Sequence, residues 1–357
     1  MIPFLILLTV PILLSPFVKD TIINHVRLNK LPLFFFFVFL TILVMLRHRN
    51  VGNDTGNYIH FFQLFSHMSW NRLLKDFTES GFRILNKGLS LISKNPQFFL
   101  AATGLAVSAL LYPTYRRVCV DSPLTIVLFC ILPTFSMMFS GIRQMLAIGI
   151  GFIAYAFTRK KRPIPFLLSV AVAMSFHTSA FMLLFMYPLY HVRITKKWLY
   201  FVVPALMLLF VFNRQVFHVL GSLLNSYTEY SAAESSTGAY TMLLLFAAFA
   251  VFSFLVPDES LLDDETIAMR NFLLLSLMIQ LFAPLNVLAM RMNYYYIIFI
   301  PLLLPRIIQC SSVKYRSIAA AGRNAMLAFF FVYFFLTAKT GGRLHTIPYH
   351  FYWEYYR

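Results

Sequence analysis

The sequence contains few charged residues. Only 12% of its 357 residues are Asp, Glu, Lys or Arg, whereas a soluble protein of this length carries about twice that share. Hydrophobic residues make up 59% of the chain, and apolar runs recur from end to end. These values exclude an ordinary soluble domain, and we expect an all-α, polytopic helical membrane protein.

The sequence also lacks the motifs of several enzyme classes. It has no P-loop, no dinucleotide-binding glycine motif, no HExxH and no G-x-S-x-G turn. Its three cysteines, Cys119, Cys130 and Cys310, are not spaced as in a zinc site or a disulfide framework. Because the acidic residues do not cluster with histidines either, we expect no metal and no cofactor.

The positive charge that is present points to a membrane topology. A net charge of +17 would suit a nucleic-acid partner, but Lys and Arg also accumulate in the cytoplasmic loops of membrane proteins, so we expect no nucleic acid. The RKKR run at 159–162 is the clearest cytoplasmic marker. Alternation from there puts five further segments on the cytoplasmic side and both termini outside. These segments are 19–30, 113–121, 191–198, 257–270 and 306–323.

The apolar runs predict about 12 transmembrane helices, and residues 1–357 are expected to form a single transmembrane domain. The first residues, MIPFLILLTVPILL, lack the basic segment of a cleaved signal peptide, so we expect them to form the first span. The expected spans lie near 2–18, 31–46, 97–112, 122–139, 142–158, 163–176, 178–190, 199–212, 240–256, 271–290, 294–308 and 324–338.

Two long segments fall on the outer side. Segment 47–96 mixes aromatic and polar residues at helix-like spacing, which indicates amphipathic helices at the membrane surface. Segment 213–239 is polar and rich in serine, and it could act as a mobile lid.

Polar residues gather at the outer ends of the spans. Arg143 begins a stripe of small residues with Ala147, Gly151 and Ala154, which predicts close helix packing and turns Arg143 into the bundle. The alternative is that Arg143 extends to the lipid headgroups. His177, in the turn after the sixth span, should come close to Arg143 if the fifth and sixth spans are neighbours. A histidine suits proton transfer near neutral pH, or it is simply bonded to a nearby carbonyl or lipid phosphate.

Two further outer features carry polar residues. RNVGNDTGNY at 49–58 places Asp54 between two glycines, where it either closes a turn or faces the outer cavity beside Arg49. Arg291 stands before three tyrosines at the junction of the tenth and eleventh spans, a place that also suits an aromatic belt.

Six motifs, in this order and spacing, resemble the EpsG family of bacterial polysaccharide polymerases of the Wzy type. The resemblance runs from about residue 45 to residue 310. The motifs are RNVGNDTGNY (49–58), GFRILNKGLSLI (81–92), GIRQMLAIGI (141–150), RKKR (159–162), SFHTSAFMLL (175–184) and RMNYYY (291–296).

The resemblance implies an enzyme of the bacterial inner membrane with its active site facing the periplasm. It would join oligosaccharide repeat units carried on undecaprenyl pyrophosphate into O-antigen or capsular or exopolysaccharide. The implied fold is the all-helical glycosyltransferase class C type. Its partners would be the lipid-linked oligosaccharides and membrane lipid, with a chain-length regulator and a flippase of the same pathway.

The outer polar residues can be assigned roles in such a reaction. Arginine binds phosphate oxygens bidentately, so Arg143 and Arg291 are expected to hold the pyrophosphate. His177 is expected to deprotonate the acceptor hydroxyl or to be a further pyrophosphate ligand, and Asp54 is the alternative base. Weaker candidates for sugar contacts are Arg49, Tyr58, Gln144 and Tyr294.

Three other functions stay open from the sequence. A flippase for the same lipid-linked sugar would show inverted repeats and polar residues at the midplane, and neither is visible. An O-antigen ligase would use the same arginines and histidine with a different acceptor. A structural membrane component would leave the outward polar residues unexplained.

Overall fold

The computed structural model describes residues 1–15, 21–23, 26–28, 30–223, 237–312, 315–338 and 344–354. Most of these residues are helical, which confirms the expected helical class. The strands among them are β1 (Thr21–Ile23) and β2 (Val26–Leu28), which pair antiparallel. The chain divides into two compact units, Met1–Leu184 with Ala321–Arg357, and Phe185–Ala320. The single transmembrane domain stays a prediction, and each unit is described by itself.

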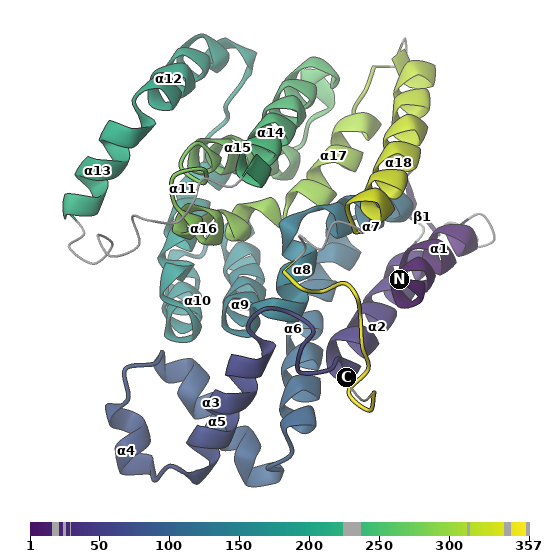
Figure 1. Cartoon of the computed structure of the whole chain (residues 1–357). Helices are drawn as coiled ribbons and strands as arrows, with labels where there is room; N and C mark the ends of the chain where they lie inside the picture. The colour runs from purple at the N-terminus through teal and green to yellow at the C-terminus, as the bar shows by residue number, and fades with distance from the viewer. Residues whose placement is uncertain are drawn as a thin grey trace. The chain divides into compact units, whose positions relative to one another are not determined.

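The first unit holds most of the helices (Figure 1). Besides the hairpin it contains α1 (Ile2–Leu14), α2 (Leu31–Leu46), α3 (Thr55–His67), α4 (Trp70–Lys75), α5 (Ser80–Ile92), α6 (Pro96–Val118), α7 (Ser122–Ile131), α8 (Pro133–Ser140), α9 (Ile142–Arg159), α10 (Pro163–Phe176), most of the 3-10 helix η2 (Thr178–Phe185) and most of α18 (Arg316–Ala338).

Glycines allow the helices of this unit to pack closely. A Cβ on Gly104 of α6 would lie 2.8 Å from a Val44 methyl of α2, and one on Gly149 of α9 would lie 2.8 Å from Leu110 of α6. Gly151 faces Leu183 of η2, where a Cβ would lie 3.0 Å from a methyl carbon. Small residues at such positions let apolar helices approach each other without a large hydrophobic driving force. The predicted small-residue stripe of α9 is therefore a packing surface.

The C-terminal tail returns to the loop after α2. Tyr352 N donates to Leu46 O at 2.9 Å, and Gly52 N donates to His345 O at 3.0 Å. These two bonds place the tail and the loop at 46–53 on one side of this unit, as expected for two outer segments.

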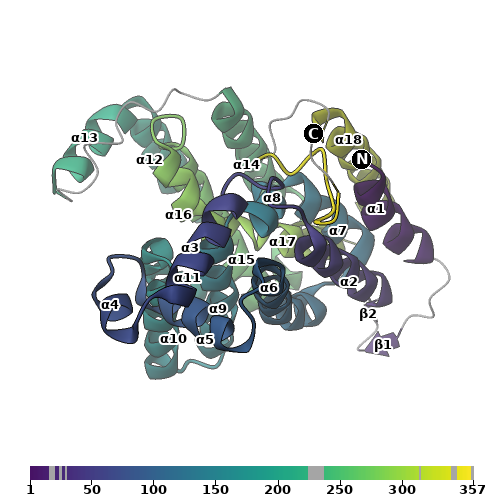
Figure 2. The same cartoon turned by 60° about the horizontal axis from the view of Figure 1, so that its bottom comes forward.

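The two terminal helices of the unit also meet. Figure 2 shows α1 beside α18, where Phe4 contacts Phe334 with ring centroids 6.4 Å apart.

The predicted amphipathic segment contains three helices, α3, α4 and α5. Helix α5 turns its polar side inward: Arg83 bonds to Leu73 O, and Lys87 Nζ donates to Ser66 O at 3.0 Å. These cations bind the carbonyls at the ends of α4 and α3, where a positive charge is favourable. Helix α5 exposes the apolar Ile84, Leu91 and Ile92. Helices α3 and α4 expose apolar and polar side chains together, among them Leu64, Trp70 and Leu74 beside Gln63, Asn71 and Lys75.

The second unit contains α11 (Met186–His191), η3 (Lys196–Trp198), α12 (Leu199–Val211), α13 (Asn213–Leu223), α14 (Thr237–Leu255), η5 (Glu259–Leu261), α15 (Asp264–Gln280), α16 (Val287–Ile297) and α17 (Ile300–Gln309). Helix α15 packs against α11, α14, α16 and α17 and so forms the centre of this unit.

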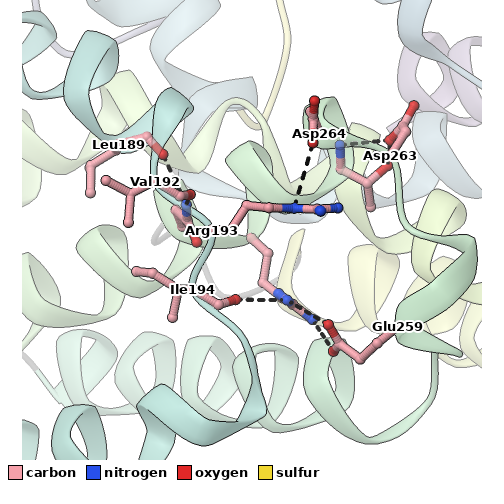
Figure 3. A network of polar contacts seen from close by, with 10 residues as sticks. Leu189, Val192, Arg193, Ile194, Glu259, Asp263 and Asp264 are labelled. Carbon is pink, nitrogen blue, oxygen red and sulfur yellow. Dashed lines mark hydrogen bonds and ion pairs between the residues drawn. The ribbon is translucent and has the colours of Figure 1, made fainter.

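A polar network ties the segment after α11 to α15 (Figure 3). Arg270 is fully buried and forms a bidentate ion pair with Glu259, with N–O distances of 2.6 and 3.1 Å. Its Nη2 also donates to Ile194 O at 2.8 Å, and Asn271 Nδ2 donates to Val192 O at 2.6 Å. The segments joined here, 191–198 and 257–270, are two of those expected on the cytoplasmic side.

Three described helices are long and apolar enough to cross a membrane: α6, residues 238–255 of α14, and α18. The number rises to six if each of three bent helix pairs counts as one span. The apolar helices α1, α2 and α10 are shorter than a full crossing.

Several expected spans differ from the helices observed. The span at 122–139 is two helices bent by 68°, because Pro133 cannot donate a helical hydrogen bond. The expected helix at 178–190 begins as the 3-10 helix η2. The helix expected at 271–290 begins earlier, since α15 covers Asp264–Gln280. It begins there because Asp263 caps α15 by accepting from Thr266 N at 2.9 Å. The predicted loop 213–239 begins with α13, and its residues 224–236 lie outside the described residues.

Candidate functional site

Arg143 and His177 share one carboxylate in the first unit. Arg143 Nη1 lies 2.6 Å from Glu79 Oε2, and His177 Nδ1 lies 3.2 Å from Glu79 Oε1. All three side chains are partly exposed, at 27% for Arg143, 17% for Glu79 and 16% for His177. The predicted proximity of Arg143 and His177 is therefore confirmed, and Arg143 is held by an ion pair instead of extending freely to headgroups.

A glycine contact brings these residues together. Arg143 and His177 stand at the ends of α9 and α10, which pack along each other. Glu79 directly precedes α5, whose first turn meets the end of α10. A Cβ on Gly81 would lie 2.4 Å from Ser175 Oγ and 2.9 Å from Ser175 O. Because only glycine fits there, α5 approaches α10 closely enough for Glu79 to reach His177.

Aromatic rings line the other side of Arg143. Its guanidinium carbon is 5.6 Å from the ring centroid of Phe82 and 5.8 Å from that of Tyr58. Both rings are buried, and such contacts stabilise a cation further when water is excluded. Arg143 Nε is buried and has no hydrogen-bond partner among the described residues. Because Nε itself is closed to solvent, an anion can approach the guanidinium only at its terminal nitrogens, one of which Glu79 already holds.

The electrostatics of the site keep Glu79 ionised. Burial alone would raise the pKa of Glu79, but the hydrogen bond from His177 and the charge of Arg143 outweigh it and lower the pKa to about 2. Burial raises the pKa of Tyr58, and the neighbouring Arg143 opposes this shift. An ionised carboxylate only accepts hydrogen bonds, so His177 must donate its Nδ1–H to Glu79. In neutral His177 the lone pair then lies on Nε2, where it can accept a proton.

Asp54 lies in the loop that leads into α3. Gly52 has a positive φ of 87°, and a Cβ there would lie 2.5 Å from Phe139 O at the end of α8. Asp54 N donates to Ser140 Oγ at 3.3 Å, which ties the loop to the residues just before α9. The loop therefore places half-buried Asp54 one helical turn before Tyr58. Arg49 is exposed and, within the described part of the chain, makes no ion pair with Asp54.

The remaining predicted residues are placed less favourably or in the second unit. Gln144 is buried, with 3% of its surface exposed, so a direct contact with a sugar would require local opening. Arg291 is exposed on α16, in the second unit. Tyr294, one turn further along α16, is buried. Their roles stay predictions. Among the described residues no group of three His, Cys, Asp or Glu side chains could hold a metal ion.

Glu79 is the site residue that the sequence prediction missed. It is 64 residues from Arg143 and 98 from His177, so no local pattern joins them. Two features could have signalled it. Acidic residues are scarce, at 13 in the whole chain, and Glu79 stands directly before the small pair Ser80–Gly81 in a segment expected on the outer side.

Comparison with known proteins decides the family. The model of the EpsG family matches residues 30–351, which is nearly the whole chain. The chain belongs to the EpsG family. No curated protein and no solved structure matches the chain. The EpsG family consists of Wzy-type polysaccharide polymerase-like proteins, so the predicted resemblance is confirmed. The match and the apolar helices together support a membrane protein with a glycosyltransferase-like role in polysaccharide synthesis.

Proposed function

We propose that this EpsG-family protein joins oligosaccharide repeat units carried on undecaprenyl pyrophosphate into O-antigen or capsular or exopolysaccharide, and releases undecaprenyl pyrophosphate. The family match over residues 30–351 carries this proposal. The cluster of Arg143, Glu79 and His177 supports it, because a cation and a base side by side suit the two needs of this transfer.

In the proposed reaction, His177 Nε2 accepts the proton of an acceptor hydroxyl. The hydroxyl oxygen forms a bond to the anomeric carbon of the donor sugar. The bond from that carbon to the pyrophosphate oxygen breaks, and the pyrophosphate leaves with the electron pair. Glu79 holds the tautomer of His177 that this step needs and stabilises the imidazolium that forms. Asp54 is the alternative base.

Arg143 stabilises the leaving pyrophosphate in this proposal. Negative charge grows on the pyrophosphate as the glycosidic bond breaks, and a guanidinium fixed in advance lowers the cost of that charge. Arg291 is proposed as a second pyrophosphate ligand, since arginine matches phosphate oxygens bidentately. Asp54 and Arg49 are proposed to line the acceptor or sugar side. Arg49, Tyr58, Gln144 and Tyr294 are proposed as weaker sugar contacts.

We further propose 12 membrane crossings, a class C glycosyltransferase fold and an active site on the periplasmic face of the inner membrane. Contacts between segments expected on the same side support this topology. Loop 46–53 meets the tail, and the segment 191–198 meets α15. The outward apolar side chains of α3, α4 and α5 fit helices that lie in the outer lipid surface. A chain-length regulator and a flippase are the proposed pathway partners.

The experiment that tests the function uses the purified protein and a defined lipid-linked repeat unit. Longer lipid-linked products should appear without nucleotide sugar and without added metal. If no elongation occurs but the protein moves polymer onto a lipid A core acceptor, the ligase activity is correct instead. Movement of intact repeat units across vesicle membranes without elongation would identify a flippase.

A further inference from the structure

The guanidinium of Arg143 is already occupied by a carboxylate. Glu79 Oε2 lies 2.6 Å from Arg143 Nη1, the distance of a strong charge-assisted hydrogen bond. An anionic ligand that binds Arg143 therefore competes with Glu79. The other oxygen of the same carboxylate contacts His177 Nδ1 at the longer distance of 3.2 Å. One carboxylate thus divides its charge between a cation and a neutral or protonated imidazole.

We propose that Glu79 is a positioning residue that couples donor binding to activation of the base: the donor's pyrophosphate displaces Glu79 from Arg143, and Glu79 then acts on His177 alone. This inference rests on the proposed function. Glu79 keeps the proton on His177 Nδ1 throughout. Once Arg143 has turned to the pyrophosphate, the full charge of Glu79 favours the imidazolium. Proton transfer from the acceptor hydroxyl therefore becomes easier only when the donor is bound.

The surroundings of Glu79 fit such an exchange. Its backbone is fixed, because the next turn of α5 packs on Ser175 through Gly81. Its side chain is partly exposed, so it can rotate without leaving a buried charge unpaired. The rings beside Arg143, Tyr58 and Phe82, do not replace the carboxylate as a counter-ion. A pyrophosphate carries more negative charge than one carboxylate and binds an arginine fork in two places.

The exchange predicts opposite effects on binding and on turnover. If Glu79 were only a structural partner of Arg143, its loss would misplace Arg143 and weaken both pyrophosphate binding and turnover. If Glu79 competes with the pyrophosphate, its loss strengthens pyrophosphate binding. It also slows the chemical step, because His177 loses the carboxylate that favours its protonation.

The test uses Glu79→Gln in the full-length protein, which keeps the shape of the side chain and removes its charge. Binding of inorganic pyrophosphate is measured by titration, and elongation of a lipid-linked repeat unit gives kcat. We expect about fivefold tighter pyrophosphate binding, since a partly exposed ion pair is worth roughly that factor, and at least tenfold lower kcat. Adding Arg143→Ala should cancel the gain in binding.

Glu354→Gln is the matched control. Glu354 also pairs with a histidine, His350, at 3.1 Å, in the same unit but in the tail. Glu354→Gln should change neither pyrophosphate binding nor kcat. Glu79→Asp keeps the charge on a side chain one methylene shorter and serves if the glutamine variant does not fold. It should show the same two opposite changes at smaller size.

Unchanged or weaker pyrophosphate binding in an otherwise folded Glu79 variant overturns the exchange, and so does an unchanged kcat. These outcomes differ from failure of the proposed function, in which the unaltered protein itself does not elongate the lipid-linked repeat unit.

Discussion

Replacing Gly81 by alanine is expected to move the first turn of α5 away from α10 and so to separate Glu79 from His177. The added Cβ would lie 2.4 Å from Ser175 Oγ, 2.9 Å from Ser175 O and 3.0 Å from a ring carbon of Phe176. The hydroxyl could rotate, but the backbone carbonyl cannot move without shifting the end of α10. That end carries His177, so the clash acts directly on the site.

The expected size of the effect follows from two opposing terms. Overpacking at a tight contact costs about 1–3 kcal/mol. Alanine in place of a helical glycine stabilises the helix by about 0.5–1 kcal/mol, because it has the higher helix propensity. The clash dominates, and the free energy of unfolding should fall by about 1–2 kcal/mol. Gly88, in the same helix, is the matched control, because a Cβ there meets nothing within 4 Å. Gly88→Ala should stabilise the protein by about 0.5–1 kcal/mol.

Thermal unfolding in detergent and the length distribution of the polysaccharide product measure the two consequences. Gly81→Ala should lower the unfolding temperature and shorten or abolish the polymer, while Gly88→Ala should raise the unfolding temperature slightly and retain activity. If the two variants are equally stable and equally active, the close contact of α5 with α10 does not position the site.

Three further predictions concern charged residues. Arg143→Ala and Arg291→Ala should each abolish long polysaccharide while the protein stays in the membrane; normal ladders in both variants would refute the pyrophosphate assignment. Because the pKa of Glu79 is lowered from 4.5 to about 2, its ionised form stabilises the fold above about pH 4.5, and this stabilisation is lost as the pH falls through about 2. The difference in melting temperature between the unaltered protein and Glu79→Gln should therefore shrink from pH 5 toward pH 2, and a constant difference would contradict it. Asp121 and Arg323 form two contacts of 2.7 and 2.8 Å. Asp121→Asn and Arg323→Ala should each cost about 1 kcal/mol, and the double variant no more than either alone, as a double-mutant cycle by chemical denaturation would measure.

Much of the helix content follows from composition, but helix ends and breaks depend on local chemistry. The apolar run at 122–139 looks continuous, yet it bends by 68° where Pro133 begins a new helix. Helix α15 starts at Asp264 because Asp263 accepts from Thr266 N at 2.9 Å. The apolar run alone predicts that this helix begins near residue 271, which would place buried Arg270 in a loop. Hydrophobicity indicates where a helix is favourable, and capping decides where it begins.

The site shows the same division. Arg143 and His177 were predictable as a pair, because Arg143 begins the small-residue stripe of the fifth expected span and His177 directly follows the sixth, the next span along the chain. The predicted pair lacked its carboxylate. Glu79 enters through the contact of Gly81 with Ser175, and a contact between residues that far apart in the chain has no signature in a single sequence.

The helical class, the family and the pairing of Arg143 with His177 can be predicted without a structure, because they follow from local hydrophobicity, spacing and motif order. The folded chain was needed to show that Arg143 is paired with Glu79 and that His177 donates to the same carboxylate. It was also needed to show that the polar side of α5 faces inward, where Arg83 and Lys87 bind backbone carbonyls. Such partnerships depend on which helix ends meet in space, and packing between distant segments sets that geometry.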